Sequence, residues 1–134
     1  MSVQALLQAA IMAALEAHAP LAGAVTGVFD APPVRGARPY ALIGDALLAD
    51  WGTKDMAGRE GRFAVTLHDL GERPERVRAL LGEVDTAIEA MPRTLGDGWR
   101  IASLAFVRGR IVREGEARWL GTSEWRVRML RSEL

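Results

Sequence analysis

The groups in this sequence that could carry out acid–base chemistry are two histidines and one neighbouring carboxylate. His68 is followed directly by Asp69, a pair that could imitate a general base and the group that orients it. Neighbouring residues on a strand point to opposite faces, so we expect no side-chain hydrogen bond between them. His18 falls at the end of a predicted helix, where an imidazole can meet the last carbonyls. Both histidines are therefore interpreted as structural.

The sequence also lacks the residue spacing of other reactive or metal-binding sites. The chain has no cysteine, which excludes disulfides, thiolate metal sites and cysteine nucleophiles. Asp50 and Asp55 share a polar segment, but a calcium loop needs denser oxygen ligands. The Gly-Arg-Glu-Gly segment 58–61 lacks the lysine and hydroxyl of a P-loop. Ser103 and Ser123 have no nucleophile elbow around them. We therefore expect no catalytic residue, cofactor or metal, and interpret the protein as not an enzyme.

Tryptophans stand out in a chain with few other aromatic residues. Trp99 and Trp125 fit strand interiors and are predicted core residues, because an indole buries a large area. Trp51 lies in a polar segment and could anchor a contact between subunits, since interface hot spots favour tryptophan and arginine. Stacking on nucleic-acid bases is the alternative interpretation.

Arginines near the C-terminus could form a basic strip if the last two strands pair. They are Arg110, Arg113, Arg118, Arg126, Arg128 and Arg131. We favour a solvated sheet face on which nearby carboxylates neutralise them, because isolated surface ion pairs contribute little. The expected carboxylates are Glu114, Glu116 and Glu124.

Two helices must position these residues. Ser2 can cap the first helix, and apolar residues recur at helical spacing from Val3 to Leu15. The second helix is expected to begin at Pro74 and to stop before Pro92. Its apolar stripe comprises Val77, Leu80, Leu81, Val84, Ile88 and Met91.

Four strands are predicted beside the helices. The run Tyr40–Leu48, nearly continuously apolar and interrupted by Gly44 and Asp45, predicts a strand largely covered on both faces. The alternation over Arg62–His68 predicts a half-buried strand. Between them, Asp50–Gly61 is predicted to be a long loop. Two more strands are expected at Trp99–Arg113 and Ala117–Leu130. In the last strand, apolar and charged residues alternate from Glu124 onward.

The element order α-β-β-α-β-β predicts an α+β fold, with an antiparallel sheet of about four strands and two helices packed on one face. The length suits one domain, residues 1–134. Basic and acidic residues balance at 17 each, so the net charge does not indicate nucleic-acid binding. The start lacks a basic region before an apolar stretch, so we expect no signal peptide. The apolar run of the first helix is too short to cross a bilayer.

Three motifs follow the first helix in turn: Val28-Phe29-Asp30-Ala31-Pro32-Pro33, then Arg38-Pro39-Tyr40-Ala41-Leu42-Ile43-Gly44, then Asp50-Trp51-Gly52-Thr53-Lys54-Asp55. The combination of Pro-Tyr before an apolar strand, then Trp and Thr-Lys-Asp, is unusual. With the surrounding layout, it resembles the tail completion, or tail terminator, family of long-tailed phages and phage-derived gene transfer agents. The resemblance covers nearly the whole chain.

This resemblance implies a structural virion protein that forms a hexameric ring at the head-proximal end of the tail tube. The ring stops tube polymerisation and joins the tail to the head-completion, or stopper, protein. The implied partners are therefore other copies of the chain, the tube protein and the stopper, with no membrane. DNA passes through the lumen without sequence-specific binding. The implied location is the head–tail junction of a particle assembled in the bacterial cytoplasm.

A ring of identical subunits needs a heterologous contact, in which one patch meets a different patch of the next copy. The segment Asp50–Gly61 is long for a connection, and such loops are usually functional or disordered. We therefore expect ring or tube contacts from Trp51, Lys54, Asp55, Met56, Arg59 and Glu60. A mobile solvent loop is the alternative.

Two other classes of function remain open. Another head–tail connector, a stopper or an adaptor, shares small size and ring assembly, and its position in a particle distinguishes it. A small enzyme or nucleic-acid-binding domain predicts a converging site or a basic face. Salt-dependent retention of DNA by the isolated protein would favour that last class.

Overall fold

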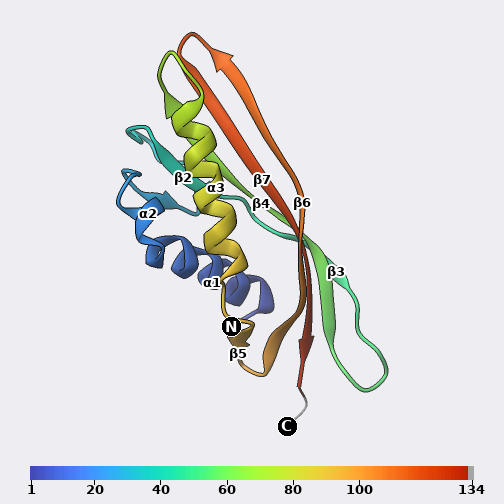
Figure 1. Cartoon of the computed structure of the whole chain (residues 1–134). Helices are drawn as coiled ribbons and strands as arrows, with labels where there is room; N and C mark the ends of the chain where they lie inside the picture. The colour runs from blue at the N-terminus through green and yellow to red at the C-terminus, as the bar shows by residue number, and fades with distance from the viewer. Residues whose placement is uncertain (133–134) are drawn as a thin grey trace.

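Three helices form a layer on one face of a β-sheet in the computed structural model, which describes residues 1–132 (Figure 1). They are α1 (Val3–Ala17), α2 (Ala19–Ala22) and α3 (Glu75–Glu89). The Ser2 hydroxyl accepts a hydrogen bond from the Ala5 N–H at 3.1 Å, so the predicted cap of the first helix is confirmed. Pro74 takes the cap position of α3, one residue before its first turn. None of the helices in residues 1–132 is long and apolar enough to cross a membrane.

The sheet is curled and runs in the order β1-β2-β4-β7-β6-β5, with β3 paired to β4 beside this path. Its strands are β1 (Val28–Phe29), β2 (Tyr40–Ile43), β3 (Leu47–Asp50), β4 (Gly58–Leu70), β5 (Thr94–Gly96), β6 (Trp99–Gly115) and β7 (Arg118–Arg131). Every pairing is antiparallel except β1 with β2. The α+β class is thus confirmed. The expected count of four strands and two helices is wrong, because residues 1–132 form seven strands and three helices.

The predicted single strand Tyr40–Leu48 is in fact two strands. The chain leaves β2 at Gly44 and rejoins the sheet as β3 at Leu47. Both strands pair with β4 on the same side, β2 with residues 65–68 and β3 with residues 59–62. The predicted loop Asp50–Gly61 is therefore also wrong: Asp50 ends β3, residues 58–61 begin β4, and residues 51–57 connect them. Gly44 and Asp45, which interrupt the apolar run in the sequence, mark the position of this break.

The core lies between the sheet and the helices. Alternate residues of β4 and β7 face the helices, so Val65, Leu67 and Val127 are fully buried. Trp125 is 2% exposed and Trp99 is 7% exposed, which confirms both as core residues. The fully buried residues of the helices are Leu7, Ile11, Leu15, Leu21, Val77, Val84 and Ile88. These residues recur at helical spacing, so each of the longer helices buries one apolar face against the sheet and all three helices lie on one face of it.

Two surfaces are left uncovered by this arrangement (Figure 1). The β3–β4 hairpin, with its connection 51–57, projects away from the helical layer at the lower right of the view. The sheet face opposite the helices, called the outer face below, carries no helix. These two surfaces are the ones a partner can reach on the sheet.

Candidate functional site

His68 and Asp69 lie on opposite faces of β4, as their adjacency predicts. His68 stacks on Tyr40 with ring centroids 4.6 Å apart, and its Nε2 is 3.1 Å from the Thr66 hydroxyl. Asp69 is 1% exposed and accepts hydrogen bonds from Arg76 Nε at 3.0 and 3.1 Å. Burial lowers the pKa of His68, and the positive charge of Arg38 lowers it further. The two side chains do not act on one another, so they form no base–orienter pair.

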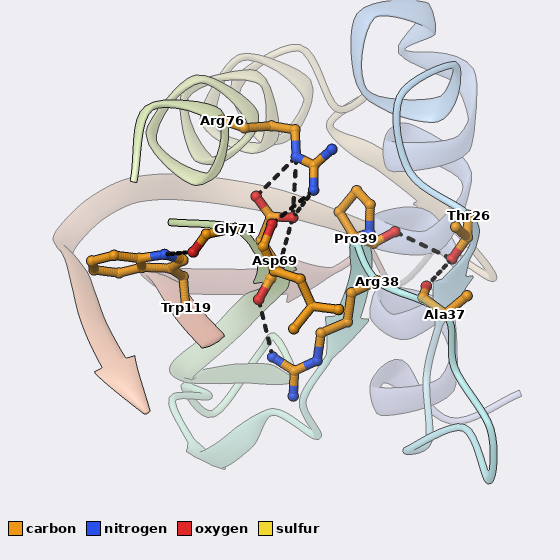
Figure 2. Close-up of polar contacts among 9 residues, drawn as sticks. Thr26, Ala37, Arg38, Pro39, Asp69, Gly71, Arg76 and Trp119 are labelled. Atoms are coloured by element: carbon orange, nitrogen blue, oxygen red, sulfur yellow. Dashed lines mark hydrogen bonds and ion pairs between the residues drawn. The ribbon is translucent and has the colours of Figure 1, made fainter. Parts of the chain in front are cut away.

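Asp69 instead organises a structural network at the end of β4 (Figure 2). Arg38 donates to the Asp69 carbonyl at 3.3 Å, and the Trp119 indole donates to the Gly71 carbonyl at 2.9 Å. The Thr26 hydroxyl lies 3.2 Å from the Pro39 carbonyl and also contacts that of Ala37. The network fastens α3 and the segment before β2 to the sheet. Arg76 was missed from the sequence, because nothing in its spacing from Asp69 indicates the contact.

The nearest approach to a nucleophile with a carboxylate is Ser123 with Asp85. The Ser123 hydroxyl donates to Asp85 Oδ1 at 2.5 Å and accepts from the Trp125 indole N–H at 2.7 Å. Burial raises the pKa of Asp85, an effect that the hydrogen bond from Ser123 opposes. Ser123 is fully buried, so no substrate can reach its oxygen. The arrangement satisfies the indole of a core tryptophan.

His18, the second histidine, contacts a carboxylate rather than helix carbonyls through its ring. Its Nε2 lies 2.7 Å from Glu83 Oε2, which links the end of α1 to α3. No group of three or more potential metal ligands occurs within residues 1–132.

The six residues expected at an interface occupy the projecting hairpin. Trp51, Lys54, Asp55 and Met56 lie in the connection, whereas Arg59 and Glu60 lie in β4. The structure gathers two of them around a residue of β7: the Arg128 guanidinium lies 5.2 Å from the Trp51 ring centroid and donates to Glu60 at 3.1 Å. Arg59 lies 3.3 Å from Asp50. Lys54 and Asp55 are exposed at the tip, and Trp51 and Met56 line a groove with Leu130.

The outer face is rich in arginine. Residues that alternate with the buried Trp125, Val127 and Met129 point to this face, and the pairing of β4 and β6 with β7 continues it sideways. By this register it carries Arg62, Arg100, Arg108, Arg110, Arg118, Arg126 and Arg128, with the carboxylates of Glu60 and Glu124. Of the predicted strip, Arg113 and Arg131 do not belong. Arg113 lies 5.8 Å from the Trp119 ring centroid, and Arg131 donates to the Asp97 carbonyl.

The expected neutralisation of these arginines is only partly correct. Glu124 accepts from Arg108 at 2.6 Å and lies 3.8 Å from Arg62, as expected of a neutralising carboxylate. Glu114 pairs instead with Arg38 at 3.6 Å, and Glu116 makes no ion pair within residues 1–132. The outer face therefore keeps a basic excess that the balanced net charge hides.

The fold places the protein in the α+β class, with a helical layer on one face of a curled sheet and an exposed hairpin and outer face. Comparison with known protein families identifies the family within this fold class. Residues 9–129 match the model of the family described as tail completion protein gp17. The chain belongs to this family, and it is a structural protein of the virion tail.

A solved structure supports the same relationship. The chain is similar to a chain in the structure "Virion of native gene transfer agent (GTA) particle", with 28% sequence identity and a TM-score of 0.76. The match covers 92% of this chain and 94% of that one. No curated protein sequence matches the chain.

Proposed function

We propose that the protein is a tail terminator. Copies of it form a hexameric ring at the head-proximal end of the tail tube, stop tube polymerisation and join the tail to the head-completion, or stopper, protein. The observation that carries this proposal is the match to a chain of a gene transfer agent virion, which extends over nearly the full length of both chains. DNA passes through the lumen without sequence-specific binding, and the role requires no catalytic chemistry.

The β3–β4 hairpin supplies one side of the ring contact in this proposal. Leu47 on β3 is 82% exposed, a cost in water that a neighbouring surface would remove. Leu47 lies opposite Arg62 and lines a groove with Leu48 and Ala49. The half-buried Trp51 and Met56 and the exposed Lys54 and Asp55 follow along the hairpin, in the connection 51–57. An apolar centre with a polar rim is the usual composition of a protein interface. Arg59 joins the two strands of the hairpin through Asp50, and Glu60 anchors the hairpin to β7 through Arg128.

The terminator role is tested by deleting the gene and measuring tail length and head attachment by electron microscopy. Without a terminator, tubes should grow beyond the normal length and remain unattached to heads. Supplying the wild-type gene should restore short, joined tails. Normal-length tails joined to heads in the deletion strain would contradict the proposal.

The hairpin contact is tested by complementation with Leu47→Asp, which places a charge in the proposed contact. The matched control is Val34→Asp, since Val34 is 99% exposed and lies outside the hairpin. Both purified variants should unfold at the wild-type temperature, because neither side chain is buried. We expect joined tails with the Val34 variant and not with the Leu47 variant. Normal joining by both variants would refute the hairpin contact and leave the terminator role standing.

A further inference from the structure

We infer that the outer face of the sheet binds the phosphate backbone of duplex DNA. Positive charge is concentrated on this face of the molecule. The whole chain has a net charge of zero, yet the outer face gathers seven arginines against the two carboxylates Glu60 and Glu124. Such a one-sided patch creates a local positive potential that the net charge conceals.

Four of these arginines have no neutralising contact. Glu60 is used by Arg128, and Glu124 by Arg108 and Arg62. The other four enter no ion pair and no side-chain hydrogen bond within residues 1–132, and all are exposed; they are Arg100, Arg110, Arg118 and Arg126. Their donors are therefore available to an external anion.

The pairing register also sets two arginines against each other. Arg62 on β4 lies directly opposite Arg126 on β7, on the same face of the sheet. Like charges in directly opposed positions destabilise a sheet. A polyanion laid across the face would convert this repulsion into attraction at both residues.

Duplex DNA fits this face better than an acidic protein does. Small residues separate the central arginines, namely Ala64, Thr66, Ser103, Ala105 and Thr122. By the same register the large apolar residues Leu47, Val112, Leu120 and Leu130 lie toward the ends and edge of the face, so an apolar centre typical of a protein interface is not formed between the central arginines. The planar guanidinium matches phosphate geometry. Arg118 and Arg128 lie ten residues apart on β7, about 33 Å at about 3.3 Å per residue, close to one duplex turn of about 34 Å. Contacts of this kind position DNA and do not read its sequence.

In the proposed ring, DNA contact would place the outer face toward the channel and the helices on the outside. This placement rests on the proposed function, whereas the binding itself is a property of the isolated subunit. Salt-dependent DNA retention therefore does not by itself separate a ring subunit from a nucleic-acid-binding domain, contrary to what the sequence alone suggested. The binding is tested on purified protein, and the ring on particles.

The test measures binding of the purified full-length chain to a short fluorescein-labelled duplex by fluorescence anisotropy. The measurement is repeated at a series of salt concentrations that starts at low ionic strength. Four phosphate contacts at about −0.9 each predict a slope of log K against log salt of about −3 to −4. The double variant Arg110→Gln with Arg126→Gln should reduce the magnitude of this slope by about 2 for every duplex sequence. The control, Arg73→Gln with Arg78→Gln, makes the same charge change in the connection before α3 and within α3, outside the strands that form the outer face. It should leave the slope unchanged.

Three results would overturn the inference. One is the lack of salt-dependent binding by the wild-type chain. Another is an equal loss of slope in both double variants, which would mean that overall charge, not the outer face, holds the DNA. The third is binding of polyglutamate, but not of DNA, through Arg110 and Arg126, which would assign the face to an acidic protein.

Discussion

The guanidinium of Arg128 lies over the indole of Trp51, with its carbon 5.2 Å from the ring centroid. The same guanidinium donates to Glu60 at 3.1 Å. One side chain of β7 thus holds the connection and the returning strand of the projecting hairpin. Because Arg128 also belongs to the outer face, the two surfaces that the helices leave free are joined at this residue.

Replacing Arg128 with Met should loosen the hairpin without unfolding the sheet. The lost cation–π and ion-pair contacts are partly exposed, so we expect a cost of about 1 kcal/mol in the free energy of unfolding. Hydrogen exchange should accelerate in residues 47–57, while the helices keep their protection. Arg78→Met, on α3, is the control and should change neither region. A uniform acceleration across the chain would show that Arg128 supports the whole sheet instead.

Any residue with a side chain should be destabilising at position 61. A Cβ at this position would lie 1.7 Å from the Leu47 carbonyl oxygen, a backbone atom of the paired strand that cannot move alone. Gly61→Ala should therefore lower the melting temperature and separate β3 from β4. Gly82→Ala, within α3, meets nothing within 4 Å and should stabilise the protein by about 0.5–1 kcal/mol. Thermal unfolding of both variants checks this pair, and equal melting temperatures would contradict it.

Arg76 should matter because Asp69 is buried. Arg76→Met leaves the Asp69 carboxylate with the Leu70 N–H as its remaining donor, at 2.8 Å, and should cost about 1–3 kcal/mol. Adding Asp69→Asn should recover part of this loss, because a neutral amide is less costly to bury than a charge. Denaturant unfolding of the two single variants and the double variant measures the coupling. Strictly additive losses would mean that the pair does not interact.

His68 should make stability depend on pH. Its pKa in the folded chain lies below the ordinary value of 6.5. At a pH between the folded pKa and 6.5, the unfolded chain therefore binds more protons than the folded chain. The stability contributed by neutral His68 is therefore complete above 6.5 and is lost as the pH falls through the folded pKa. His68→Phe keeps a ring to stack on Tyr40 but cannot titrate. Between about pH 8 and about pH 5, the wild type should lose more stability than this variant; equal losses would contradict the shift.

Local signals in the sequence predicted the local parts of the fold. The Ser2 cap, the stop after α3 and the alternation along β7 each depend on a few adjacent residues, and each matches the structure. The break between β2 and β3 falls at Gly44 and Asp45, but the apolar residues on both sides favoured one strand across them. The prediction of a loop there placed Arg59 and Glu60 off the sheet, although both belong to β4.

Long-range contacts could not be predicted in the same way. The pairing of Arg76 with Asp69, and of Glu114 with Arg38, depends on how distant elements pack. The outer face depends on register, since β6 shifts against β7 near Ser103 and Arg108. One sequence gives neither the strand order nor these shifts. The basic strip was therefore only an alternative in the sequence, and in the structure Arg62, Arg100 and Arg108 belong to it in place of Arg113 and Arg131.

A cryo-electron microscopy reconstruction of the head–tail junction, from particles that contain this protein, tests the terminator role most directly. We expect a closed ring of six copies between the tail tube and the head proteins, with the β3–β4 hairpin of each copy against its neighbour. A junction without this fold, or copies located at the far end of the tail, would contradict it.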